Sequence, residues 1–82
     1  MVKILALLNN LILIAQVEEV ETELGGPDCK LINPYVIEFD GSLEPFLGNY
    51  TSQDTLMMSS DKILTLVDPK PTLLEKYQDL IK

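Results

Sequence analysis

The feature that most constrains the fold of this chain is a short strand that is apolar on both of its faces. Because successive side chains of a strand point to opposite sides, residues 63–67 place Ile63 and Val67 on one face and Leu64 and Leu66 on the other. A chain of 82 residues has little else with which to cover a second apolar face. We therefore expect another subunit to cover it.

The length and the cysteine content limit how such a chain can be stabilised. A chain of 82 residues makes one domain. A domain of this size buries only about 60% of the surface that its unfolded chain exposes. Cys29 is the single cysteine and histidine is absent, which excludes an internal disulfide and a histidine metal site. A lone cysteine is typical of a reducing cytosol, and we expect Cys29 to be buried and unreactive. Association between subunits is the remaining source of stability.

The charge of the chain bears on its partners. The net charge is −7, and the six basic residues are all lysines. Nucleic-acid binding draws much of its affinity from neutralised phosphates, and it often uses the guanidinium fork of arginine. An acidic surface without arginine is poorly suited to that task, although the same acidity keeps a small aliphatic protein in solution.

An apolar run over residues 4–15 has the hydrophobicity of a signal-peptide core, but other features argue against that interpretation. Asn9 and Asn10 lie in its centre, Lys3 is the only basic residue before it, and no small-x-small cleavage site follows before Glu18. The run is also shorter than the roughly 20 residues that cross a bilayer. We interpret it as two buried strands around a two-residue turn at Asn9 and Asn10, and we expect no membrane partner.

Hydrophobic patterning predicts five strands and no internal repeat. Pro34 falls within the third strand and, lacking an N–H, predicts an edge, a bulge or a bend there. Residues 42–54 show no regular pattern. We predict a mostly β fold, namely a small five-stranded bent antiparallel barrel over about residues 2–68, with strands at 2–8, 11–23, 29–39, 55–58 and 63–67.

The end of the chain predicts a helix over about residues 72–82. Thr72 and Glu75 match a capping box, in which each side chain bonds a backbone amide of the first turn. A helix of about ten residues is too short to persist alone in water, so its apolar face must dock. That face comprises Leu73, Leu74, Tyr77, Leu80 and Ile81.

The sequence does not indicate enzymatic chemistry. It offers no histidine base, no nucleophile with an evident activating partner and no glycine-rich phosphate loop. Its carboxylates are not spaced like a loop that holds Ca²⁺ or Mg²⁺. We therefore expect no catalytic residue, no metal and no cofactor.

The strand pattern resembles the Sm and Sm-like (LSm) family of small SH3-like barrels. The second Sm motif of that family runs isoleucine, arginine, glycine, two variable positions and alternating aliphatics. Residues 58–66 match its aliphatic positions, with Ser59 and Ser60 where arginine and glycine belong. The first Sm motif is matched more loosely, by the turn at residues 8–10 and by residues 15–17 and 28–33.

Over nearly its whole length the chain is also similar to small uncharacterised Sm-like proteins of marine phages, of the cyanophage type. The similarity lies in residues 30–34 and in residues 60–63, which lead to Pro69 and a terminal helix. The motifs consist of common residue types. The Sm family normally opens with a helix, whereas this chain opens with a predicted strand and carries its helix at the other end.

The resemblance implies a closed homo-oligomeric ring of about five to seven subunits. Neighbours are expected to pair the strand at residues 55–58 with the strand at residues 63–67 of the next subunit, which hides unpaired backbone groups. The expected interface residues are Thr55, Met57, Ile63, Leu64, Leu66 and Val67.

The resemblance also implies an RNA site at the ring pore, with Ser59, Ser60, Asp61, Lys62 and Lys30 as its residues. Two functions stay open. One is an Sm-like ring with weak, salt-sensitive binding of single-stranded RNA or an RNA-chaperone role. The other is a protein-interaction scaffold of phage origin that has lost RNA binding, with host or phage proteins as partners. Either would act in the cytoplasm, of the host cell if the chain is phage-encoded.

Overall fold

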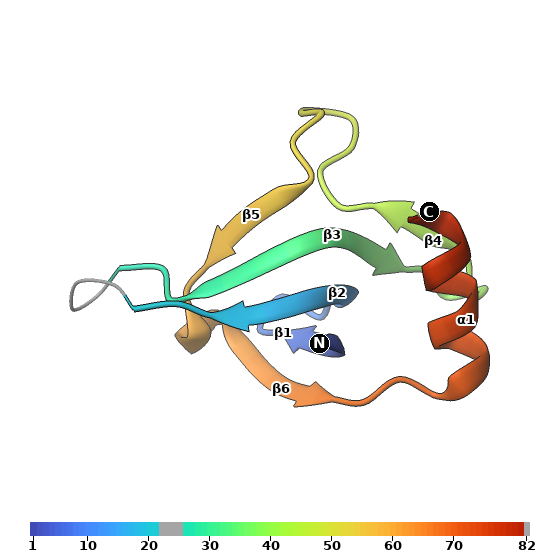
Figure 1. Ribbon diagram of the computed structural model, residues 1–82, viewed down its shortest axis with the longest axis horizontal. Helices are drawn as coiled ribbons and strands as arrows, with labels where there is room; N and C mark the ends of the chain where they lie inside the picture. The colour runs from blue at the N-terminus through green and yellow to red at the C-terminus, as the bar shows by residue number, and fades with distance from the viewer. Residues whose placement is uncertain (22–25, 82) are drawn as a thin grey trace.

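The computed structural model describes residues 1–21 and 26–81. Within them a bent antiparallel sheet is followed by a C-terminal helix, which confirms the predicted mostly β fold (Figure 1). The elements are β1 (Val2–Leu7), β2 (Ile12–Glu19), β3 (Cys29–Ile37), β4 (Leu43–Pro45), β5 (Thr55–Met58), the 3₁₀ helix η1 (Ser60–Lys62), β6 (Ile63–Val67) and α1 (Pro71–Leu80).

The strands form one sheet in the order β4-β3-β2-β1-β6, and β5 also pairs with β3. Residues 29–32 of β3 pair with β5, and residues 35–37 pair with β4. Between these two stretches Asn33 adopts a φ of 52° and the register with β2 shifts. The predicted irregularity at Pro34 is thus confirmed as a bend. The six-stranded sheet is not closed, because in the described chain β5 and β6 pair with other strands and not with each other.

Two local predictions about the strands are wrong. The segment 42–54, expected to be irregular, contains the short strand β4. The turn after β1 has three residues, because the Leu7 N–H donates to the Leu11 carbonyl and Asn10 takes the positive φ of 69°. In addition, β2 ends at Glu19 and not at residue 23, although residues 22 and 23 themselves lie outside the described residues.

The inner face of the bent sheet holds the core. The core residues come from β1, β2 and β3 and alternate along each strand, as one buried face requires. Half-buried side chains from the loops and from β5 and β6 complete this layer, among them Phe46, Met58 and Ile63. The buried cluster consists of Leu5, Leu7, Leu13, Ala15 and Leu31.

A second apolar layer lies on the outer face of the sheet, beneath α1. Ile14 is fully buried there, although its neighbours Leu13 and Ala15 point into the core. Tyr77 of α1 is also fully buried and packs edge-on against Tyr35, the cross-strand partner of Ile14, with ring centroids 5.9 Å apart. The prediction of a buried strand is confirmed for Leu13, Ile14 and Ala15, whereas Ile12 at the start of β2 is 37% exposed.

The docked face of α1 is partly as predicted. Tyr77 is buried and Leu73, Leu74 and Ile81 are half-buried, but Leu80 is exposed. The predicted capping box is wrong, because the helix begins at Pro71 and its N-cap is Lys70, whose side chain makes no capping bond. Proline fits this first position because its missing N–H would have no partner there.

None of the helices among the described residues has the length and apolarity needed to cross a membrane.

Candidate functional site

The predicted RNA-binding turn is held by hydrogen bonds within the protein. The Lys62 N–H donates to the Ser59 carbonyl at 3.0 Å, and the Ile63 N–H donates to the Ser60 carbonyl. The Leu8 N–H donates to the Lys62 carbonyl at 3.3 Å, which joins the turn to the β1–β2 loop. The backbone of the turn is therefore largely occupied by internal bonds.

Asp28, just before β3, fastens η1 to the rest of the sheet. Ser60 donates its backbone N–H to Oδ1 and its hydroxyl to Oδ2 of Asp28, each at 2.7 Å. Both bonds favour the ionised carboxylate, the hydroxyl bond most, and they lower the pKa of Asp28 from its usual 3.8. The Ser60 hydroxyl proton and N–H are consequently committed to Asp28 rather than free for a ligand.

The turn borders a shallow hollow of about 160 Å³, lined by Gly26, Asp28, Ser59, Ser60 and Asp61. Two of these five residues carry carboxylates and none is basic. Such a hollow attracts cations or hydrogen-bond donors and repels phosphate. Among the described residues, however, no group of three histidine, cysteine, aspartate or glutamate side chains gathers that could hold a metal ion.

The structure places the two predicted lysines on different elements. Lys62 is exposed at the end of η1, whereas Lys30 is half-buried on β3, opposite Glu18 of β2 and Met57 of β5. In the described part of the chain no hydrogen bond or ion pair joins Lys30 to residues 59–62. Ser59, Ser60 and Asp61 therefore share one hollow, and Lys30 does not line it.

Sequence reasoning matched residues 28–33 loosely to the first Sm motif but did not predict that Asp28 bonds to Ser60. Asp28 precedes Cys29 and follows Pro27 and two glycines, residue types that interrupt a strand. Its partner Ser60 lies 32 positions further along the chain. No local pattern links the two residues. Only the pairing of β3 with β5, which sets Cys29 opposite Met58, brings them together.

The predicted interface residues lie on β5 and β6, each of which pairs along one edge only within the described residues. Leu64 is 68% exposed and Leu66 is 45% exposed, and Val67 and Met57 are about as exposed as Leu66. Thr55 and Ile63 are half-buried. In a single subunit, β6 therefore leaves apolar side chains exposed on both of its faces, as the sequence predicts.

The faces of β6 differ from the prediction in one respect. The register between β1 and β6 shifts between Ala6 and Leu7, so that Leu66 lies opposite Leu5 and Ile63 opposite Leu7. Directly opposed residues share a face, and Leu5 and Leu7 both belong to the core. The prediction that Ile63 and Leu66 face opposite sides is wrong, because strict alternation holds only without a bulge.

The free edges of the sheet differ in how well they are protected. An unpaired edge invites another strand unless it is short or carries charge or proline. The edge strand β4 has three residues and includes Glu44 and Pro45. The edge of β6 has five residues, Ile63–Val67, and carries neither a charge nor a proline. The edge of β5, Thr55–Met58, likewise carries neither a charge nor a proline, so β5 and β6 are the edges of the described chain that are open to strand addition.

Cys29 is buried at the start of β3, as predicted. Burial, followed by the nearby negative charges of Asp28 and Glu19, raises the pKa of its thiol above the usual 9.0. The thiolate is the reactive form of cysteine, and a raised pKa keeps Cys29 in the unreactive thiol form. Cys29 is therefore a packing residue.

The fold and these surfaces define a small, open, bent β-sheet protein with a C-terminal helix, whose most exposed apolar strand is also its least protected edge. The chain belongs to DUF6561, a family of unknown function, which matches residues 1–82. No curated protein matches the sequence.

Proposed function

We propose that this chain forms a closed homo-oligomeric ring and that the ring serves as a protein-interaction scaffold. Each subunit offers the free edge of β5 to the free edge of β6 of the next copy. The observation that carries the proposal is the β6 strand, which is uncharged, unpaired along one edge and apolar on both faces.

Such an interface is favourable because it hides both polar and apolar groups. Strand pairing satisfies the unpaired N–H and C=O groups of both edges. Burying a leucine side chain contributes about 1.5–3 kcal/mol, and both Leu64 and Leu66 have surface to bury. Since β5 and β6 are different surfaces of one subunit, the contact is heterologous, and each added subunit is rotated relative to the last. A closed ring forms when these rotations add up to a full turn. A ring of about five to seven subunits follows from the Sm-like resemblance.

The commitment of Ser60 favours a scaffold over an RNA-binding ring. Ser60, which stands at the glycine position of the motif, could donate to a base only through its hydroxyl and amide, and Asp28 accepts from both. Ser59, which stands at the arginine position, lacks the guanidinium fork. The hollow beside Ser60 is acidic, and the chain carries a net charge of −7, which opposes phosphate. Binding of single-stranded RNA through Lys62 and Lys30 therefore stays a prediction from the resemblance, and the structure gives it little support.

Mass measurement of charge variants tests the ring. Sedimentation equilibrium of the unchanged protein should give a fixed multiple of the 9.2 kDa subunit. Leu64→Asp should give monomers, because Leu64 is 68% exposed and the substitution places a charge in the apolar interface, whereas Leu66 shares a face with the core residue Leu5. Leu80→Asp is the matched control, since Leu80 on α1 is 47% exposed and lies away from both edges. A stable monomer of the unchanged protein at micromolar concentration, or equal loss of mass in both variants, would contradict the proposal.

A fluorescence titration with short U-rich and A-rich single strands separates the two functions. The scaffold function predicts no saturable binding at moderate salt for either strand. Lys62→Glu and the control Lys70→Glu, on the loop before α1, should then behave alike. Saturable binding that survives moderate salt and is lost only in Lys62→Glu would establish the RNA-binding function instead.

A further inference from the structure

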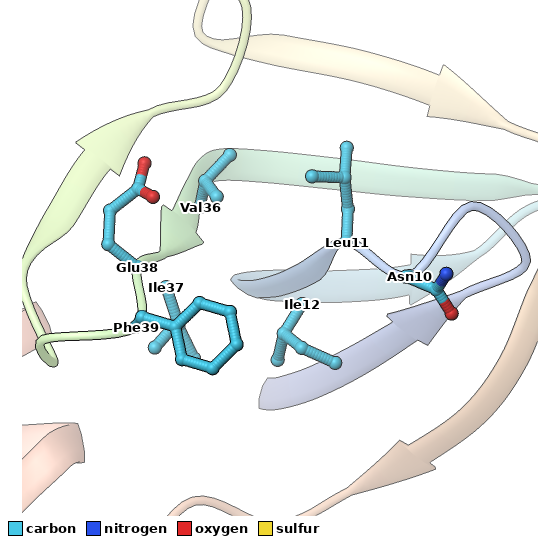
Figure 2. Close-up of a pocket in the computed structure, with 7 residues that line it drawn as sticks. All are labelled: Asn10, Leu11, Ile12, Val36, Ile37, Glu38 and Phe39. Carbon is cyan, nitrogen blue, oxygen red and sulfur yellow. The ribbon is translucent and has the colours of Figure 1, made fainter.

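The sheet splits at one end, because β2 and β3 stop pairing with each other before they stop pairing with their outer neighbours. The register of β2 with β3 ends at Leu13 opposite Val36. Beyond that point β2 stays paired with β1 through Ile12, and β3 stays paired with β4 through Ile37. A hollow of about 410 Å³ lies at this split, and we call it the split hollow. Its lining includes Leu11, Ile12, Val36, Ile37, Glu38 and Phe39 (Figure 2).

The split hollow is lined by apolar side chains from both faces of the sheet. Leu11 and Val36 pack against the core, and because successive side chains alternate, Ile12 and Ile37 lie on the outer face. Figure 2 shows these two pairs pointing in opposite directions, with Glu38 on the side of Val36. The hollow can therefore surround an apolar side chain that enters the split.

Phe39 lies at the margin of the split hollow, and its ring is fully exposed. It is one of only two phenylalanines in the chain, and the other, Phe46, is half-buried against the core. Exposed aromatic side chains beside an apolar recess are typical of the centres of protein interfaces. The position of Phe39 therefore favours contact with another molecule.

A second hollow adjoins the first and is acidic. It measures about 530 Å³ and shares Val36 and Glu38 with the split hollow. Glu44 of β4 lies directly opposite Val36, so the side chains of Glu44 and Val36 share one face of the sheet. Among the described residues neither Glu38 nor Glu44 has an ion pair or a side-chain hydrogen bond. This acidic hollow is lined by Val36, Glu38, Glu44, Pro45, Gly48 and Asn49, none of which is basic.

We propose that the two hollows together bind an extended segment of another protein in which a bulky apolar side chain lies close to a lysine or arginine. The apolar side chain enters the split hollow and packs on Phe39, and the cationic side chain meets Glu38 and Glu44 in the acidic hollow. The charge of the site selects this occupant. Two unpaired carboxylates on a chain of net charge −7 repel a second copy and attract a basic partner.

The arrangement of the hollows suits an extended peptide. They meet at Val36 and Glu38, which are two positions apart and therefore roughly 7 Å apart along the strand direction. In an extended peptide, side chains two positions apart have the same spacing and point to the same face. One partner segment can thus place an apolar and a cationic side chain in the two hollows at once.

The site is complete within one subunit, because neither hollow includes a residue of β5 or β6. It extends the proposed scaffold function by naming the chemical class of the partner. The wider role rests on the proposed ring, which repeats the site in every subunit, so that linked weak contacts gain strength by effective concentration. Binding of a single peptide, in contrast, should not need the ring.

The exposure of the two carboxylates predicts how binding responds to salt. Glu38 and Glu44 are both exposed, and exposed ion pairs contribute little and are screened by salt. The apolar contact with Phe39 should therefore supply most of the affinity, whereas the carboxylates select a cationic partner. Binding should weaken as salt is raised, but it should not disappear as long as Phe39 is present.

Fluorescence anisotropy with a capped, labelled peptide tests the site. The probe consists of glycines and serines with one phenylalanine and, two positions to either side of it, a lysine. The unchanged protein should bind this probe saturably at low salt. Phe39→Ser should weaken binding about tenfold, as the loss of an aromatic anchor does. Glu38→Gln should weaken it about two- to threefold at low salt, as expected for an exposed ion pair.

Two matched variants and one altered probe are the controls. Tyr50→Ser removes a ring that is 86% exposed and lines neither hollow, and Glu75→Gln on α1 removes the same charge as Glu38→Gln. Both should bind the probe like the unchanged protein. A probe with glutamate in place of each lysine should not bind. Because Phe39 is fully exposed, Phe39→Ser should unfold at the same urea concentration as the unchanged protein.

Several results would overturn the site. These are the absence of saturable binding at low salt, equal binding by Phe39→Ser and the unchanged protein, and equal loss in Glu38→Gln and Glu75→Gln, which would mark attraction by net charge alone. Self-association that only Phe39→Ser abolishes would identify a second copy as the occupant. Saturation by octylammonium without binding of the peptide would identify a small amphiphile, and either result overturns the proposed partner.

The ring-breaking variant Leu64→Asp separates this site from the ring. It should bind the probe like the unchanged protein, because Leu64 lines neither hollow. A monomeric protein that still binds the probe would contradict the ring and support the site. An intact ring that does not bind the probe would overturn the site and leave the ring standing.

Discussion

Tyr77 is the side chain that fastens the helix to the sheet. Its single hydroxyl proton is shared between the carbonyl oxygens of Asn33 at 2.8 Å and Ile32 at 3.2 Å, and its ring packs edge-on against Tyr35. Asn33 is the residue at which β3 bends with a positive φ. Tyr77 thus satisfies backbone carbonyls at the point where the strand cannot pair regularly, and it buries the outer apolar layer.

Tyr77→Phe should lower the free energy of unfolding by about 1 kcal/mol, because it keeps the ring but leaves the two carbonyls without their donor. Urea unfolding followed by circular dichroism measures the change. Tyr50→Phe is the control, since Tyr50 is exposed and its loss of a hydroxyl should change nothing measurable. Equal effects of the two substitutions would contradict the role of the Tyr77 hydroxyl.

The ionisation of Tyr77 should make the fold sensitive to alkali. Burial raises the pKa of Tyr77 from the usual 10.0 to about 12, so the unfolded chain loses this proton at lower pH than the folded chain. The stability that Tyr77 contributes is therefore present below pH 10.0 and is lost as the pH rises toward about 12. Between these values the unchanged protein should lose stability more steeply than Tyr77→Phe, and parallel pH profiles would contradict this.

Asp28 should make the stability of the fold sensitive to acid, whereas Tyr77 makes it sensitive to alkali. The hydrogen bonds from Ser60 hold the pKa of Asp28 below 3.8, so its stabilising effect is present above that pH and is lost as the pH falls through the lower folded value. Asp28→Asn should flatten the loss of stability in this acid range. Ser60→Ala, which removes the hydroxyl donor to Asp28, should flatten the same range in part. An acid profile that neither substitution changes would refute the assignment.

At the scale of elements, the start of α1 is the place where a local sequence rule was misleading. Lys70 occupies the N-cap with an extended backbone, and Thr72 lies inside the first turn. Lys70→Ser should therefore raise the free energy of unfolding by about 1 kcal/mol, since serine can cap an amide that lysine cannot. Thr72→Ala should change it by less than about 0.5 kcal/mol. Thermal unfolding of both variants checks this, and a loss of stability confined to Thr72→Ala would restore the capping box.

The elements that sequence reasoning predicts well are those with a strong, continuous apolar pattern. The bounds of β5 and β6 agree with the expected 55–58 and 63–67, and β1 and β3 agree to within two residues. β4 was missed because three residues that include Pro45 carry too little pattern. The β1–β2 loop was predicted one residue too short, since a pair of asparagines does not reveal which of them takes the positive φ.

Long-range pairing accounts for the errors at the candidate site. The bulge in β6 depends on its register with β1, and the bond between Asp28 and Ser60 depends on the pairing of β3 with β5. Neither pairing leaves a local mark in the sequence. The exposed apolar face of β6, in contrast, was predictable, because it follows from five adjacent residues and the small size of the chain.

At the scale of the whole molecule, the sheet of the described chain stays open between β5 and β6, and the proposed ring joins copies through the edges of these two strands. Such a ring leaves α1 for further contacts, because α1 includes no residue of β5 or β6. Under this proposal, neighbouring subunits complete the sheet of each subunit.

Hydrogen exchange of the β5 and β6 amides tests this pairing between subunits directly. In each strand, alternate N–H groups point away from the strand that the subunit itself supplies. We predict that these outward amides are protected from exchange in the unchanged protein and lose that protection in Leu64→Asp, while amides of β2, which is paired on both sides, stay protected in both. Outward amides of β5 and β6 that exchange as fast in the unchanged protein as those of the loop at residues 51–54 would contradict the account.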